Sequence, residues 1–158
     1  MVRRETFANT IATAVVAVGI TWVAFHNRAL VPVFEAPPGG VFGIVPGTFN
    51  FSLLVTLILT RVVRARVRNG RIARGDVPGL AGFTRLMPRN VLVRALLVAC
   101  VMSLIFLPLT YGSIWIALNA GLLPQAWSVL GMEVLFGVHF TLLSVVVTSL
   151  VVAAALRD

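Results

Sequence analysis

Four long segments of the chain carry almost no charge, and their lengths lead to the first prediction. A helix that crosses about 30 Å of hydrocarbon needs roughly 20 predominantly apolar residues. Residues 6–25, 41–63, 91–111 and 129–156 meet that requirement, and the turn-forming residues between them separate the segments. The pattern predicts an all-α, polytopic membrane protein: a four-transmembrane-helix bundle built from two parallel helical hairpins.

The composition supports this interpretation. The chain is 59% hydrophobic and 11% charged, whereas soluble domains average roughly 45–50% apolar and roughly 25% charged residues. A water-soluble fold is therefore not expected. The basic residues are flanked by long uncharged runs rather than interleaved with aromatic and polar groups, so nucleic-acid binding is not expected.

The distribution of arginine predicts the orientation in the membrane. All 13 basic residues are arginine, and nine of them lie between Arg61 and Arg94. Short loops rich in basic residues stay in the cytoplasm. We therefore expect a plasma-membrane location (the inner membrane, if the source is bacterial) with both termini cytoplasmic. Arg3 and Arg4 before an apolar stretch also resemble the start of a secretory signal, but residues 6–25 exceed the 7–15 apolar residues of a signal core.

The arginine-rich connection between the second and third segments predicts contact with lipid. Each arginine near an anionic leaflet contributes about 1 kcal/mol of attraction, so this connection should lie on anionic lipid at the cytoplasmic face. An alternative is a docking site for an acidic cytoplasmic partner. The residues expected at the lipid surface are Arg61, Arg64, Arg66, Arg68, Arg71 and Arg74.

The two halves of the chain show weak internal similarity. A shift of 89 residues places residues 51–65 on residues 140–154 without a gap, with Phe51 matching Phe140 and Ala65 matching Ala154. Duplication predicts a first hairpin at residues 1–68, a cytoplasmic linker at 69–90 and a second hairpin at 91–158. Such a parallel repeat is related by an axis along the membrane normal.

These same residues carry a resemblance to a known family. Residues 102–130 (MSLIFLPLTYGSIWIALNAGLLPQAWSVL), followed by the apolar helix from Phe140, resemble the short bacterial two-helix membrane proteins of domain of unknown function 2798. Residues 51–64 are similar to the closing helix of that family, with Arg61 and Arg64 at its basic end. The prolines of that closing helix are absent. The resemblance implies one family unit in each half and no known activity.

Three polar residues are candidates for an intramembrane site. Ionisable groups inside a membrane span are costly and mark functional positions by default. His139 meets Asn50 under the 89-residue shift, so both should turn inward at one depth; Glu133 lies near the outer end of the last segment. The alternatives are a structural hydrogen bond for His139 and contact with headgroup water for Glu133.

Small residues and one proline predict where helices approach one another. Gly43 and Gly47 have GxxxG spacing, which Ala8 and Ala12 repeat with alanine, and such spacing permits close contact between helices. Pro108 is expected to bend the third segment.

These patterns indicate a small non-enzymatic membrane protein, either a transport or permeation component or a partner subunit. The alternative is a membrane-embedded enzyme or an accessory subunit of one. Catalysis needs convergent groups, and the sequence offers no recognisable arrangement of them. No cofactor or metal site is expected. The expected partners are the bilayer, anionic lipids, and a second copy or another membrane protein.

Overall fold

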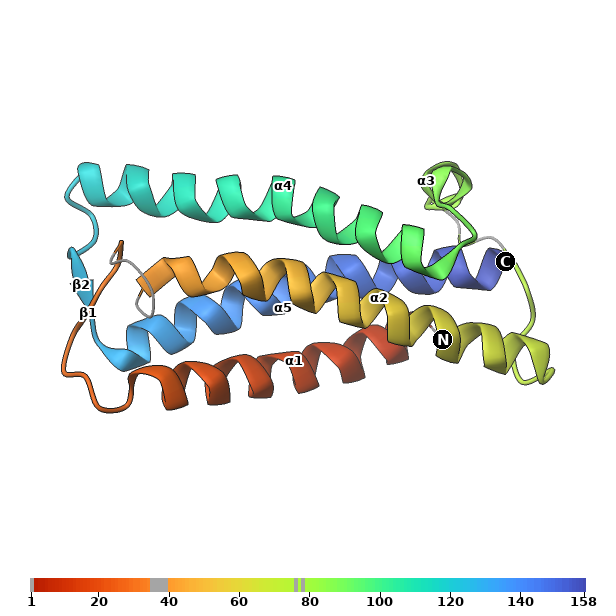
Figure 1. Cartoon of the computed structure of the whole chain (residues 1–158), viewed down its shortest axis with the longest axis horizontal. Coiled ribbons are helices and arrows are strands. Elements are labelled where there is room, and N and C mark those ends of the chain that lie inside the picture. Colours follow the sequence, from red (N-terminus) through yellow and green to blue (C-terminus); the bar gives the residue numbers. More distant parts are fainter. Residues whose placement is uncertain (1, 35–39, 76, 78) are drawn as a thin grey trace.

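The chain forms a bundle of four long helices that lie side by side (Figure 1). The computed structural model describes residues 2–34, 40–75, 77 and 79–158, and only the backbone of residues 2–9. The long helices are α1 (Val2–Phe25), α2 (Ile44–Arg68), α4 (Val91–Asn119) and α5 (Val129–Arg157). The all-α prediction is confirmed in this coarse form.

Within the described part of the chain, three helical segments are long and apolar enough to cross a membrane: Gly40–Arg68, Val91–Asn119 and Val129–Arg157. The first comprises the 3-10 helix η1 (Gly40–Gly43) and α2. In α1, the apolar part with described side chains is Thr10–Phe25.

The predicted end of the third segment was wrong. Tyr111 and Gly112 do not break α4, which continues to Asn119 and is followed by Gly121 at a φ of 69°. Turn-forming residues are weak breakers in an apolar setting, because a helix satisfies its backbone hydrogen bonds internally. The predicted starts are accurate, since the Asn90 and Ser128 side chains cap α4 and α5 by accepting backbone N–H groups.

The two helices of each predicted hairpin are not each other's main packing partners. The extensive contacts join α1 with α5, α2 with α4, and α2 with α5. The predicted hairpins therefore do not form separate packed units among the described residues. In the 89-residue sequence alignment, α1 corresponds to α4 and α2 corresponds to α5. The α1–α5 contact and the α2–α4 contact are therefore equivalent contacts between the two halves.

A short antiparallel pair of strands joins the two loops at the end of the bundle opposite the chain termini (Figure 1). Val31 in β1 (Val31–Pro32) pairs with Trp127 in β2 (Ala126–Trp127). Gly40 closes the first loop with a φ of 57°, and a Cβ there would lie 2.2 Å from the Val33 carbonyl oxygen. This position therefore requires glycine.

The predicted packing residues fall into two groups. Gly43 and Gly47 lie against the α5 side chains of Phe136 and Phe140, and a Cβ on Gly47 would be 2.6 Å from the Phe140 ring. This places α2 close to α5. The structure exposes Ala12 and Pro108, while the side chain of Ala8 lies outside the described residues.

Candidate functional site

The bundle has apolar side chains outside and hydroxyl groups inside. On α2, Leu54 and Ile58 are 55% and 59% exposed, whereas Ser52 and Thr56 are fully buried. Exposed apolar residues also follow α1, α4 and α5. Water would favour the opposite distribution, so the arrangement fits an apolar solvent.

His139 lies at the centre of a polar cluster inside the bundle. It is only 4% exposed. Its Nε2 lies 2.8 Å from the Thr48 hydroxyl of α2, and its Nδ1 lies 2.8 Å from the Thr110 hydroxyl of α4. The Phe106 and Phe140 rings meet the imidazole edge to face. The histidine thus joins three helices through hydrogen bonds at both ring nitrogens.

Below His139, one face of α2 carries a column of buried hydroxyl groups at four-residue spacing. The column consists of Thr48, Ser52, Thr56 and Thr60, all with 0% exposure. The Thr48 hydroxyl also donates to the Ile44 carbonyl over 2.7 Å. The hydroxyls of Ser52, Thr56 and Thr60 have no hydrogen-bond partner among the described residues. A buried polar group without a partner is costly, and its retention requires a physical reason.

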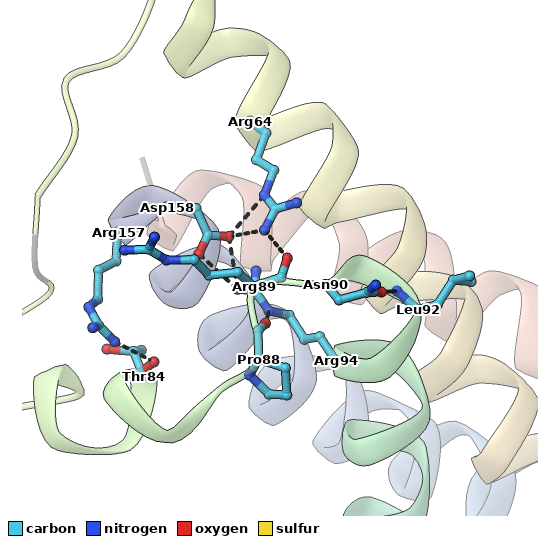
Figure 2. Close-up of polar contacts among 9 residues, drawn as sticks. All are labelled: Arg64, Thr84, Pro88, Arg89, Asn90, Leu92, Arg94, Arg157 and Asp158. Atoms are coloured by element: carbon cyan, nitrogen blue, oxygen red, sulfur yellow. Dashed lines mark hydrogen bonds and ion pairs between the residues drawn. The ribbon is translucent and has the colours of Figure 1, made fainter.

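The same face of α2 continues to Arg64, which belongs to an ion cluster at the end of the bundle (Figure 2). Arg64 Nε donates to Asp158 Oδ2 over 2.9 Å, and Arg64 Nη2 donates to the Arg89 carbonyl. Arg94 Nη2 donates to Asp158 Oδ1 over 2.9 Å, while its Nε donates to the Pro88 carbonyl. Asp158 therefore ties the ends of α2 and α5 to the start of α4.

Arg94 is the most deeply buried charge of this cluster. Its side chain is 1% exposed, compared with 12% for Asp158 and 31% for Arg64. One further contact joins α5 to the short helix α3 (Ala81–Leu86), where Arg157 donates to the Thr84 carbonyl over 2.8 Å. The cluster holds the connection between α2 and α4 against the bundle.

The predicted inward position of Asn50 is wrong. Asn50 is exposed and borders a groove lined also by Thr13, Gly47 and Phe140. Alignment of the two halves matched Asn50 with His139, but helical rotation turns Thr48, two residues earlier, towards the imidazole. Glu133 is half-buried in the second turn of α5, six residues before His139, so the three predicted polar residues do not share one cavity.

The predicted lipid-contact arginines have different surroundings. Arg61, Arg68, Arg71 and Arg74 are exposed, whereas Arg64 and Arg66 are half-buried. Sequence reasoning missed Thr48, Thr110, Arg94 and Asp158. The four-residue spacing from Thr48 to Arg64 indicates one polar helix face. Arg94 and Asp158 have opposite charges and lie at span ends predicted on the same side of the membrane, which indicates an ion pair.

Among the described residues, no group of three histidine, cysteine or acidic side chains could hold a metal ion. Comparisons with known proteins add no assignment: no family model, no curated protein and no solved structure matches the chain.

Proposed function

We propose that this chain is a four-span integral membrane protein that acts, without catalysis, as a proton-permeation component. Its apolar exterior supports membrane insertion, with α1 as the fourth span. The ends of α2 and α5 and the start of α4 meet at the arginine-rich cluster. Short basic connections remain in the cytoplasm, so this end is cytoplasmic and both termini lie on that side.

One observation carries the proton-permeation proposal: the column of buried hydroxyls that leads from His139 towards Asp158. Successive members are four residues apart, which is about 6 Å along a helix. A water with two hydrogen bonds of about 2.8 Å links oxygens about 4.5–5 Å apart, so one or two waters between successive hydroxyls would complete the path. The free hydroxyls of Ser52, Thr56 and Thr60 are the groups that such waters need.

His139 is suited to transfer a proton between the Thr110 hydroxyl on α4 and the hydroxyl column on α2. In a neutral imidazole, one nitrogen donates a hydrogen bond and the other accepts one. His139 has a hydroxyl at each nitrogen, one on α4 and one on α2. A proton accepted at one nitrogen can therefore leave from the other, and Asp158 provides a carboxylate at the cytoplasmic end.

We further propose that the chain arose by tandem duplication of a two-helix unit similar to domain of unknown function 2798. The support is the residue match between residues 51–65 and 140–154, together with the pairing of α1 with α5 and of α2 with α4. Each half then supplies one helix to the central α2–α5 contact.

Proton flux into liposomes tests the proposed function. Vesicles containing the purified chain should acidify under an imposed proton gradient faster than protein-free vesicles, as read by an internal pH dye. His139→Leu should reduce the flux to the protein-free background, because it removes both transfer atoms. Asn50→Leu is the matched control, since it removes a polar group on the groove side of α2, and it should retain the flux.

Two results would contradict the proposal: an unmodified chain with no flux above background, or a His139→Leu variant with undiminished flux. Folding must be monitored in parallel, because a hydrogen bond between helices contributes about 0.6–2 kcal/mol to stability in membranes. A loss of flux counts only for protein that retains the circular dichroism spectrum and elution volume of the unmodified chain.

The groove beside Asn50 favours a second candidate function, that of a membrane partner subunit. The groove has a volume of about 400 Å³ and is lined mainly by apolar and small residues of α1 and α2. An amide exposed to lipid is costly, so a helix of another membrane protein could cover Asn50. A partner protein should copurify with the unmodified chain and be lost from the Asn50→Leu variant. Permeation alone predicts no such difference between the two.

A further inference from the structure

A hollow of about 600 Å³ opens at the arginine-rich end of the bundle. It lies between the end of α2, the segment that precedes α4, and the end of α5. Its charged lining consists of Arg61, Arg64, Arg68, Arg74, Arg89 and Asp158. The hollow is separate from the hydroxyl column, although both include residues of the α2 face that ends at Arg64.

The charges of this lining do not balance. Among the described residues of the lining, Asp158 is the single carboxylate, and it already accepts hydrogen bonds from Arg64 and from the buried Arg94. Within the described part of the chain, Arg61, Arg68, Arg74 and Arg89 form no ion pair. Several like charges around one hollow repel one another, so a bound anion would stabilise the arrangement.

The arginines surround the hollow instead of following one surface. Arg61, Arg64 and Arg68 share one face of α2, because they are three and four residues apart. Arg74 belongs to the connection after α2, and Arg89 lies two residues before α4. The bonds from Arg64 to Asp158 and to the Arg89 carbonyl hold this side of the hollow in place.

The chemistry of the lining selects the type of anion. Guanidinium groups form paired hydrogen bonds to phosphate oxygens, and their planar shape fits this geometry. Val67 and Val91 add apolar surface to the same hollow, which suits the glycerol and acyl part of a lipid. We propose that the hollow is a binding site for a doubly charged phosphate group, as carried by a phosphomonoester lipid headgroup.

This proposal differs from general attraction to an anionic surface, because it assigns different roles to neighbouring arginines. Arg68 and Arg74 line the hollow, whereas Arg71 is exposed in the same connection but does not line it. General attraction depends on charge alone, so it predicts equal effects for the three. A defined site predicts that Arg71 contributes least.

Lipid binding by the full chain in nanodiscs tests the proposal. Phosphatidylcholine discs would be titrated with phosphatidic acid or with singly charged phosphatidylglycerol, and binding read from native mass spectra. We expect saturable binding of phosphatidic acid, weakened about tenfold by Arg68→Gln or Arg74→Gln through loss of charged hydrogen bonds. The matched control Arg71→Gln should change the affinity less than about threefold.

Inorganic phosphate identifies the source of the bound group. If inorganic phosphate competes with phosphatidic acid, the site exists and also binds soluble phosphate. If it does not compete, the site exists and takes its phosphate group from a lipid. Equal affinity for the two lipids, equal loss from Arg71→Gln and Arg68→Gln, or no binding of either phosphate source would overturn the proposal.

Discussion

Asp158→Asn is expected to lower the free energy of unfolding by about 3 kcal/mol, because it leaves a buried arginine without its counter-charge. Arg94 is 1% exposed, and Asp158 is its ion-pair partner. The substitution also removes the negative charge that pairs with Arg64, a more exposed residue whose ion pair contributes less. Reversible denaturation in mixed micelles would measure the change.

Two further variants make this test specific. Glu133→Gln neutralises a half-buried carboxylate at the opposite end of α5, where no ion pair occurs among the described residues, and should cost less than about 1 kcal/mol. Combining Asp158→Asn with Arg94→Leu should recover most of the lost stability, because the isolated charge is then removed as well. A loss from Asp158→Asn no larger than that from Glu133→Gln would contradict the described cluster.

Thr56→Val and Thr60→Val are expected to reduce proton flux while changing stability little. Both hydroxyls are fully buried without a partner among the described residues. Valine has nearly the same shape and removes each hydroxyl together with any water bound to it, so the free energy of unfolding should change by less than about 1 kcal/mol. The same change interrupts the path between His139 and Asp158, so the flux of the double variant should fall to the background.

Thr110→Val serves as the contrast, because its hydroxyl is bonded to His139 over 2.8 Å. Removing a hydroxyl with a partner should destabilise the bundle by about 0.6–2 kcal/mol. If the double variant of Thr56 and Thr60 is destabilised to the same extent, these hydroxyls have a structural role. If it is as stable as the unmodified chain and conducts normally, the hydroxyl column is not the proton path.

The sequence predicts the helices well because helix formation depends on residues that are close together in the chain. A long charge-free run can satisfy its backbone groups in lipid only as a helix, and the starts of α4 and α5 coincide with the capping residues Asn90 and Ser128. The end of α4 was predicted too early. Gly112 favours turns in water, whereas an apolar setting keeps the helix intact to Asn119.

The packing partners of the helices and the polar site depend on contacts between residues far apart in the sequence. A hydropathy pattern does not predict such contacts. Charge-free length cannot show that α1 packs on α5, nor that α2 packs on α4. The inward position of His139 followed from the cost of exposing it to lipid, but its partner did not. Thr48 and Asn50 point in different directions because they are two residues apart on a helix, and it is Thr48 that contacts the imidazole.

The central claim is that the hydroxyl column lies inside a bundle that spans a membrane, and cysteine labelling tests this spanning arrangement most directly. Single cysteines at Asn69 and Ala120, both exposed, would be introduced in a Cys100→Ala background and treated with a membrane-impermeant thiol reagent. Asn69→Cys should react only from the cytoplasmic side and Ala120→Cys only from the outer side. Reaction of both positions from the same side would contradict the claim.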